Sequence, residues 1–288
     1  MQKIGLVLSG GGAKGAYQIG VMKAIEEYGL VQQISAISGS SIGALNACLF
    51  LQYSDEDRAY IWRHLKWDYV LQLEECDYKR LMSLQRNMTT TPLSKLKMAS
   101  EVLGIARQIG LPLPRQHFSS ALDHFVDYDM IRQASIPCYI GCENIQRNWV
   151  QYFKLNGQGD EMIHDVLLAS TAIPMVYKPV RIGSGVYCDP MRYENVPLRP
   201  LLYEDCEIII IINLDVSAVQ KIPRIRHVNQ KMLITISPSQ LVSSTLQGSF
   251  DFSDQTIQEH LILGYEDAIH VLDYVFSEDS SEMTCCRE

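Results

Sequence analysis

The pentapeptide Gly39-Ser40-Ser41-Ile42-Gly43 places a serine where it could act as a nucleophile. An apolar stretch precedes it and a second one follows it, which is the strand–turn–helix setting that a nucleophile elbow requires. Flanking glycines permit a tight turn that lifts the serine hydroxyl above the sheet edge, toward the free N–H groups of the helix N-terminus. We therefore predict Ser41 as a catalytic nucleophile, with Gly39 and Gly43 forming the turn. The alternative is a purely structural turn.

A glycine-rich loop, Gly10-Gly11-Gly12-Ala13-Lys14-Gly15, lies between the first predicted strand and its helix. Its first, third and last glycines satisfy the dinucleotide-binding pattern, but that pattern needs an acidic residue about 20 residues further on. The sequence has Ser35-Ala36-Ile37-Ser38 there, and the lysine of the loop lacks the neighbours of a Walker A motif. We therefore expect an oxyanion hole instead, in which glycine N–H groups of this loop, unobstructed by side chains, face the carbonyl oxygen of an ester.

Two types of base could activate Ser41. Histidine is the usual one, and the chain has seven: His64, His117, His124, His164, His227, His260 and His270. None of them follows an apolar strand near the C-terminus, where a hydrolase triad would place its histidine. Asp189 follows an apolar stretch at 186–188, and a carboxylate held away from water could have its pKa raised enough to act as the base. Spacing alone leaves three interpretations: an aspartate base, a solvated loop aspartate, or a histidine-assisted carboxylesterase.

Hydrophobic patterning supplies the elements that would position these residues. A buried strand at 4–8 precedes the glycine loop, and a helix at 16–28, closed by Gly29, follows it. A second strand at 34–37 leads through the serine turn to a helix at 42–51. This order predicts a parallel sheet, because each crossover returns the chain in the same direction. Further strands are predicted at 136–140, 149–155, 186–188, 207–214 and 232–236, and further helices at 161–170 and 255–276.

Residues 52 to about 130 have helical patterning and no clear strand. We therefore predict a single domain over residues 1–276 with a helical insertion at about 52–130, followed by a polar, disordered tail at 277–288. The stretch from Lys79 to Phe118 contains seven basic residues and one acidic residue, with leucines and methionines interleaved. This composition suits peripheral contact with an anionic membrane, and it equally suits an insertion that packs on the domain.

The bulk properties exclude several classes of protein. A formal net charge of -8 over 288 residues argues against general nucleic-acid binding. No apolar run is long enough to predict a transmembrane helix, and the first apolar stretch enters the glycine loop without a signal-peptide cleavage site. The eight cysteines form no CxxC pair and have no histidine at metal-ligand spacing, which indicates reduced thiols in a cytoplasmic protein and no metal site.

In combination and order, these motifs resemble those of the patatin-like phospholipases. That family has a GGGxKG or GGGxRG loop, here 10–15, followed by GxSxG, here 39–43. It then has an Asp-Gly-Gly or Asp-Gly-Ala sequence leading to Asn-x-Pro, here Asp189-Pro190-Met191 and Asn195-Val196-Pro197. The segments 169–174, 178–180 and 263–268 also look like the family. The resemblance covers residues 3 to about 275, apart from the helical insertion.

The resemblance implies a three-layer α/β domain with a mainly parallel central sheet flanked by helices. It also implies a Ser–Asp dyad, with Ser41 as the nucleophile and Asp189 as the base, and no metal or nucleotide cofactor. The N–H groups of Gly11 and Gly12, with Gly10, would hold the oxyanion, and Gly15 completes the loop. The expected substrate is a phospholipid or another acyl ester, hydrolysed in the cytoplasm or at the surface of a membrane.

One departure from the family pattern lies beside the expected base. Pro190 and Met191 replace the glycines that follow the aspartate in the family. Proline restricts the backbone of Asp189 and removes one N–H donor, and Met191 adds bulk. These changes motivate an alternative function, a patatin-fold lipid-binding or regulatory protein with little or no turnover.

Overall fold

The computed structural model describes residues 2–71, 73–79, 110, 112–214, 224–240 and 249–276. The strands of this part of the chain are β1 (Ile4–Leu8), β2 (Ile34–Ser40), β3 (Cys138–Asn144), β4 (Trp149–Lys154), β5 (Val180–Ile182), β6 (Gly185–Cys188), β7 (Ile208–Ile212), β8 (Arg224–Val228) and β9 (Lys231–Ile236). They form one mixed sheet in the order β5-β6-β3-β2-β1-β7-β9-β8, and β4 pairs with β3. The central strands β3, β2, β1, β7 and β9 are parallel, as the sequence predicts.

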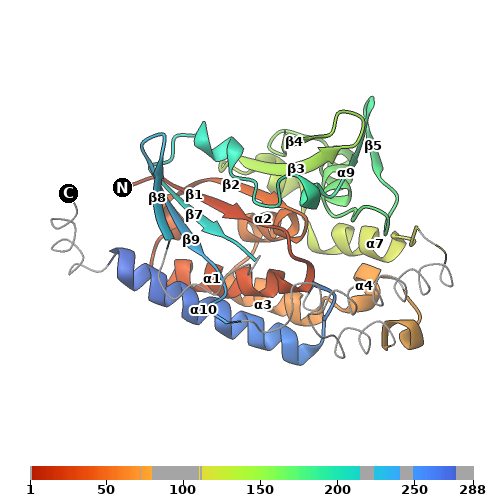
Figure 1. Cartoon of the computed structure of the whole chain (residues 1–288), viewed down its shortest axis with the longest axis horizontal. Helices are drawn as coiled ribbons and strands as arrows, with labels where there is room; N and C mark the ends of the chain where they lie inside the picture. The colour runs from red at the N-terminus through yellow and green to blue at the C-terminus, as the bar shows by residue number, and fades with distance from the viewer. Residues whose placement is uncertain are drawn as a thin grey trace, which may run out of the picture.

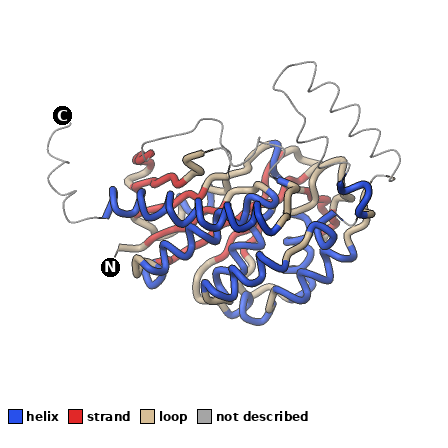
Figure 2. The backbone as a smooth tube through the Cα atoms, turned by 90° about the horizontal axis from the view of Figure 1, so that it is seen from below, coloured by secondary structure: helices blue, strands red, loops and turns tan. Residues whose placement is uncertain are grey.

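Helices flank this sheet and complete a three-layer α/β fold (Figure 1). The α-helices are α1 (Gly15–Glu27), α2 (Ile42–Gln52), α3 (Asp55–His64), α4 (Trp67–Leu71), α7 (Gln116–Phe125), α8 (Tyr128–Gln133), α9 (Asp160–Ser170) and α10 (Asp254–Phe276). Short 3-10 helices are η1 (Gly12–Lys14), η2 (Val31–Gln33), η3 (Pro190–Arg192) and η4 (Arg199–Leu202). Seen from below, helices lie in front of the strands and cover this face of the sheet (Figure 2). The expected fold class is therefore confirmed.

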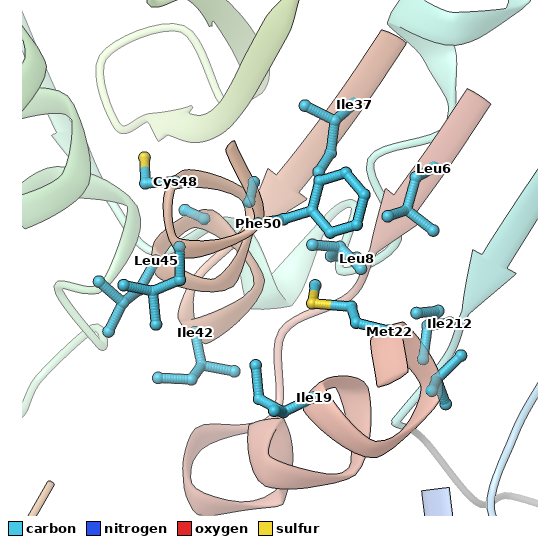
Figure 3. Close-up of a cluster of buried hydrophobic side chains, with 14 of the residues drawn as sticks. Leu6, Leu8, Ile19, Met22, Ile37, Ile42, Leu45, Cys48, Phe50 and Ile212 are labelled. Atoms are coloured by element: carbon cyan, nitrogen blue, oxygen red, sulfur yellow. The ribbon is translucent and has the colours of Figure 1, made fainter. Parts of the chain in front are cut away.

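The strand β7 shows how the layers are held together. It is a run of five isoleucines, and successive side chains of a strand point to opposite faces. Ile208, Ile210 and Ile212 join the large core under the helices, whereas Ile209 and Ile211 join a smaller cluster that contains residues of η4. Figure 3 shows side chains of α1 and α2 packed against those of β1 and β2 in the large core. Burial on both faces explains why this strand is continuously apolar.

Most predicted elements are present, with shifted ends. The expected strand at 136–140 begins only at Cys138, after a proline, and continues to Asn144 because β4 pairs with Tyr139 to Asn144. Two strands are not predicted by hydrophobic patterning: β5, which has three residues, and β8, which has the polar sequence RIRHV. The tail at 277–288 and residues 80–109 of the predicted insertion at about 52–130 lie outside the described residues. Within the described part, no helix is long and apolar enough to span a bilayer.

Candidate active site

Ser41 lies in a strained turn between β2 and α2. Its backbone has φ 55° and ψ -126°, a region that residues with a side chain rarely adopt and that often marks a functional position. The glycines of the turn are required by close packing, since a Cβ on Gly39 would lie 2.2 Å from the carbonyl oxygen of Gly43. A Cβ on Gly43 would in turn lie 2.3 Å from the carbonyl oxygen of Leu8. The turn therefore has the form expected of a nucleophile elbow.

A buried serine that the sequence analysis did not single out holds this turn. The N–H of Ser41 donates a hydrogen bond to Ser170 Oγ at 2.9 Å, and the Ser170 hydroxyl donates to the Gly141 carbonyl oxygen at 2.7 Å. Ser170 is the last residue of α9 and is fully buried. It thereby connects the turn to β3.

The sheet topology brings Asp189 to Ser41. One edge of β3 is paired with β4 along nearly its whole length, so β2 and β6 must share the other edge. The last residue of β2 pairs with Gly141, and the last residue of β6, which runs in the opposite direction, pairs with Glu143. Ser41 directly follows the last residue of β2, and Asp189 directly follows the last residue of β6. Both residues therefore approach Cys142, which lies between Gly141 and Glu143. The sequence gives no direct sign of this end-to-end meeting.

Asp189 is a buried carboxyl group in contact with Ser41. It is 1% exposed, its N–H donates to the Ala172 carbonyl oxygen at 2.9 Å, and its Oδ1 accepts a hydrogen bond from the Met191 N–H at 2.9 Å. Burial raises the pKa of Asp189 to about 6, and hydrogen bonds from the Ser41 hydroxyl and the Met191 N–H limit that rise. A carboxyl group with such a pKa can exchange a proton near neutral pH.

The departure at Pro190 and Met191 forms a short 3-10 helix, η3. Pro190 is its first residue and Asp189 is its N-cap, with φ -57° and ψ 128°, a backbone conformation that suits a residue before proline. The Met191 side chain is 51% exposed, so much of its bulk lies in solvent. Arg192 at the end of η3 forms an ion pair with the fully buried Glu143. The departure therefore leaves the Asp189 carboxyl group beside Ser41.

The glycine loop is hydrogen-bonded to Asn195, which lies in the segment that follows Asp189. The N–H of Gly10 donates to the Asn195 carbonyl oxygen at 3.1 Å, and Asn195 Nδ2 donates to the Gly10 carbonyl oxygen at 3.0 Å. The N–H groups of Gly11 and Gly12 find no backbone acceptor among the described residues, and Gly12 has φ 60°, which favours glycine. A Cβ on Gly15 would lie 2.7 Å from Trp62, so this glycine permits close helix packing. The N–H of Gly10 is therefore already hydrogen-bonded, whereas the N–H groups of Gly11 and Gly12 have no backbone acceptor among the described residues and could donate to a ligand.

Arg115, at the start of α7, is a charged neighbour of this site. Its guanidinium group donates to the Leu168 carbonyl oxygen and to Thr171 Oγ1, and it lies over the rings of Phe118 and Tyr177. Burial lowers the pKa of Arg115 to about 10, and its charge in turn lowers the pKa of the Asp189 carboxyl group. From the sequence, Arg115 is only one member of the basic stretch from Lys79 to Phe118, because no local pattern indicates how its side chain packs.

Histidine does not contact Ser41 in the described part of the chain. His164 Nε2 lies 2.9 Å from Ser119 Oγ, and His164 Nδ1 lies 3.5 Å from Asp165. Ser119, however, is the fourth residue of α7, and its own N–H already donates to the Arg115 carbonyl oxygen at 2.8 Å, so this N–H is not free for an oxyanion. His260 lies in α10, as predicted, and bonds to the Thr256 carbonyl oxygen. No group of three His, Cys, Asp or Glu residues among the described positions could hold a metal ion.

Comparison with protein families gives one match over most of the chain. A family model described as Patatin-like phospholipase matches residues 6–202. Lysophospholipase nte1 of Aspergillus terreus is 50% identical over 54 residues, which is 19% of this chain and 3% of that protein. Neuropathy target esterase sws of Drosophila persimilis is 40% identical over 79 residues, 26% of this chain and 5% of that protein. The chain therefore matches only a small part of these curated relatives.

Solved structures share the fold over nearly the whole chain. VipD from Legionella pneumophila has a TM-score of 0.56 at 15% identity, covering 94% of this chain and 67% of that one. Human GIVD cytosolic phospholipase A2 has a TM-score of 0.51 at 11% identity, covering 93% of this chain and 57% of that one. Identities this low support a common fold and nothing finer.

Proposed function

Since the chain belongs to the patatin-like phospholipase family, we propose that it is a serine lipid acyl hydrolase of the phospholipase A or lysophospholipase type. The observation that carries this proposal is the convergence of Ser41 and Asp189 from β2 and β6. The Asp189 carboxyl group is buried, with a pKa of about 6, and it hydrogen-bonds with the Ser41 hydroxyl. A nucleophile and a base in contact are the minimum requirement for covalent catalysis.

In the proposed first half-reaction, the Ser41 oxygen attacks the acyl carbonyl carbon while Asp189 takes the hydroxyl proton. The carbonyl electron pair moves to the oxygen, which receives hydrogen bonds from the N–H groups of Gly11 and Gly12. Hydrogen-bond donors fixed in advance stabilise such an oxyanion strongly. The tetrahedral intermediate then expels the alcohol, which takes the proton from Asp189, and leaves an ester on Ser41.

The second half-reaction uses the same groups in reverse order. Asp189 takes a proton from water, and the resulting hydroxide attacks the acyl-enzyme. The oxyanion forms again at the glycine loop, and its collapse releases a fatty acid while Asp189 returns the proton to Ser41. In this mechanism Gly10 does not donate to the substrate, because its N–H is bonded to Asn195. Its part is to hold the loop in place.

The expected substrates are phospholipids, lysophospholipids or other fatty-acyl esters. Two of the matched relatives are named as a lysophospholipase and an esterase. The human phospholipase is in complex with methyl γ-linolenyl fluorophosphonate. Fluorophosphonates phosphonylate activated serines with loss of fluoride, so a reagent of this class would report on Ser41. Peripheral membrane contact through Lys79 to Phe118 remains part of the proposal, although most of that stretch lies outside the described residues.

The experiment compares the native chain with Ser41→Ala and Asp189→Asn. Hydrolysis of phosphatidylcholine, lysophosphatidylcholine and a short p-nitrophenyl ester is measured, together with fluorophosphonate labelling. We expect both variants to lose about 100-fold or more in turnover. Two matched controls should retain it: Ser40→Ala, whose buried hydroxyl has no partner among the described residues, and Asp165→Asn beside His164.

The outcomes separate the alternatives. A native protein that is folded but neither hydrolyses any ester nor reacts with the fluorophosphonate would overturn the proposal and favour the non-catalytic lipid-binding function that Pro190 and Met191 suggest. Retention of labelling in Asp189→Asn, with loss in a variant of His164, would instead favour a histidine-assisted carboxylesterase.

A further inference from the structure

Three large apolar side chains are exposed at the end of the sheet where Asp189 lies. Met175 is 80% exposed, Tyr193 is 53% exposed and Trp149 is 47% exposed. Exposed apolar residues are common when single, but a group beside a functional site indicates an interaction surface. Two of the three lie close to Asp189 along the chain, since Tyr193 is four residues after it and Met175 is three residues after Ala172, whose carbonyl oxygen accepts the Asp189 N–H.

The segments that carry these side chains are joined to one another. The carbonyl of Ala172, three residues before Met175, accepts the N–H of Asp189, and Tyr193 follows η3, which begins after Asp189. Trp149 pairs with the last residue of β3, and the N–H of Ile145 donates to the Val186 carbonyl, so the β3–β4 and β5–β6 hairpins meet. In Figure 1, β4 and β5 lie on one side of the molecule, away from β8 and β9.

Met175 is held in an unfavourable backbone conformation. Its φ is 70°, which a bulky residue rarely adopts. The turn that imposes this angle is fixed on both sides, because Val176 and Tyr177 both donate to the Ile173 carbonyl oxygen, and Leu113 donates to Val176. A strained turn that presents an apolar side chain to water, where it gains no packing, suggests a partner that covers it.

The same surface is basic, although the chain carries a net charge of -8. Arg147, Lys178 and Arg181 are exposed there. The ranges 145–149, 173–182 and 190–193 contain no aspartate or glutamate. The acidic residues nearest in sequence are engaged or buried: Glu143 pairs with Arg192, Glu194 pairs with Arg199, and Asp189 is buried. Guanidinium and ammonium groups around apolar side chains complement the charge of an anionic lipid surface.

We propose that this active-site rim, formed by Arg147, Trp149, Met175, Lys178, Arg181 and Tyr193, docks on an anionic lipid bilayer. The inference rests on the proposed function for its purpose, because docking there would bring the acyl esters of the membrane to Ser41. Its location rests on the described residues alone. The rim is distinct from the Lys79 to Phe118 stretch, so the two surfaces can be tested separately.

The test is vesicle co-sedimentation in a Ser41→Ala background, which prevents turnover of the lipid. Vesicles of phosphatidylcholine with and without phosphatidylglycerol serve as probes. Met175→Ser with Tyr193→Ser removes two apolar side chains, and we expect about tenfold weaker binding to the mixed vesicles. Lys178→Gln with Arg181→Gln should also weaken that binding about tenfold and leave binding to pure phosphatidylcholine unchanged.

The chain offers a matched control for each pair. Met130→Ser with Tyr203→Ser alters the same residue types at exposed positions near the opposite ends of the strands, and Lys154→Gln with Arg226→Gln does the same for the charges. Both controls should bind as the background protein does. Equal losses in rim and control pairs, or no loss in the rim pairs, would overturn the inference. So would an absence of binding to either vesicle.

A second measurement distinguishes failure of this inference from failure of the proposed function. The rim pairs are made in the native background and assayed on a soluble p-nitrophenyl ester and on vesicles. We expect unchanged turnover of the soluble ester and about tenfold slower hydrolysis of vesicle lipid. If the rim pairs weaken vesicle binding but the native protein hydrolyses no ester, only the proposed function is overturned. If the native protein hydrolyses esters but the rim pairs do not weaken vesicle binding, only the docking inference is overturned.

Discussion

Asn195 holds Gly10 by two hydrogen bonds, one in each direction. The Gly10 N–H donates to the Asn195 carbonyl oxygen at 3.1 Å, and Asn195 Nδ2 donates to the Gly10 carbonyl oxygen at 3.0 Å. A Cβ on Gly10 would lie 2.3 Å from Asn195 Oδ1, so only glycine fits this contact. These bonds hold the glycine loop after β1 against the segment that begins at Asp189. They thereby fix the position of the expected oxyanion donors relative to the expected base.

Replacing Asn195 by alanine should therefore damage the site more than the fold. The Gly10 carbonyl would lose its side-chain donor, at a cost of about 1 kcal/mol, and the glycine loop would be free to shift. We expect fluorophosphonate labelling of the folded protein to slow about tenfold or more. Asn156→Ala is the control, because Asn156 makes three hydrogen bonds near the start of β3. It should lower stability and leave labelling of the folded protein unchanged.

Labelling and hydrolysis should increase with pH through about 6. Burial raises the pKa of Asp189 to about 6, and only the deprotonated carboxylate can take the proton of Ser41. At pH 5 the rate should be about one tenth of its plateau. The profile is measured as the second-order labelling rate, with circular dichroism to confirm folding at each pH. The same midpoint is expected for His164→Asn, and a midpoint that changes in that variant would contradict an aspartate base.

The same pKa has a consequence for stability. Because the folded protein binds the Asp189 proton more tightly than the unfolded chain does, the group's stabilising contribution is complete below the ordinary pKa of 3.8 and is lost as the pH rises through about 6. The loss amounts to about 3 kcal/mol. Asp189→Asn stays neutral, so it should exceed the native protein in unfolding free energy at pH 8, with the difference vanishing toward pH 4. Asp205→Asn is the control, because the exposed ion pair with Lys3 lowers the Asp205 pKa. Its effect on the pH dependence of the unfolding free energy should therefore have the opposite sign.

The sequence predicts the fold well where burial dictates residue type. The strands β1, β7 and β9 are apolar because helices or other chain segments cover them. The glycines at 10–15 and 39–43 are needed because neighbouring backbone or side-chain atoms approach them closely. The strands β5 and β8 were missed for physical reasons. β5 has three residues, too few for a repeat, and β8 pairs only with β9 at the edge of the sheet, where polar residues are tolerated.

The motifs of the candidate site were predictable from the sequence, but the hydrogen bonds that hold these motifs in place were not. Ser41, Asp189 and the glycine loop follow from motifs that are local in sequence. The contacts that join them cross long sequence separations: Ser170 reaches Ser41 over 129 residues, and Asn195 reaches Gly10 over 185. Serine and asparagine are common on protein surfaces, so neither residue type nor spacing indicates such roles. The engagement of the Gly10 N–H could likewise be seen only once both segments were placed.

Ser170→Ala tests the support of the elbow. It leaves the Ser41 N–H and the Gly141 carbonyl oxygen without the partner they share, so we expect about 1–3 kcal/mol lower stability and slower labelling of Ser41. Ser119→Ala is the matched control, since it removes a hydroxyl that bonds His164 between α7 and α9. Unfolding in urea and labelling are measured for both. Loss of labelling in Ser119→Ala, with none in Ser170→Ala, would show that the elbow is not held as the hydrogen bonds indicate.

Gly43→Ala should separate the elbow from the sheet. The added Cβ would lie 2.3 Å from the Leu8 carbonyl oxygen and 2.7 Å from that of Ser9, and both are backbone atoms that cannot rotate away. The first turn of α2 must therefore move from β1, at a cost of about 1–3 kcal/mol. This movement would take Ser41 away from the glycine loop and slow labelling. Gly159→Ala is the control, because a Cβ there meets nothing within 4 Å, and it should change stability by less than about 1 kcal/mol. Native-like labelling in a folded Gly43→Ala protein would mean that the close approach of α2 to β1 does not position the nucleophile.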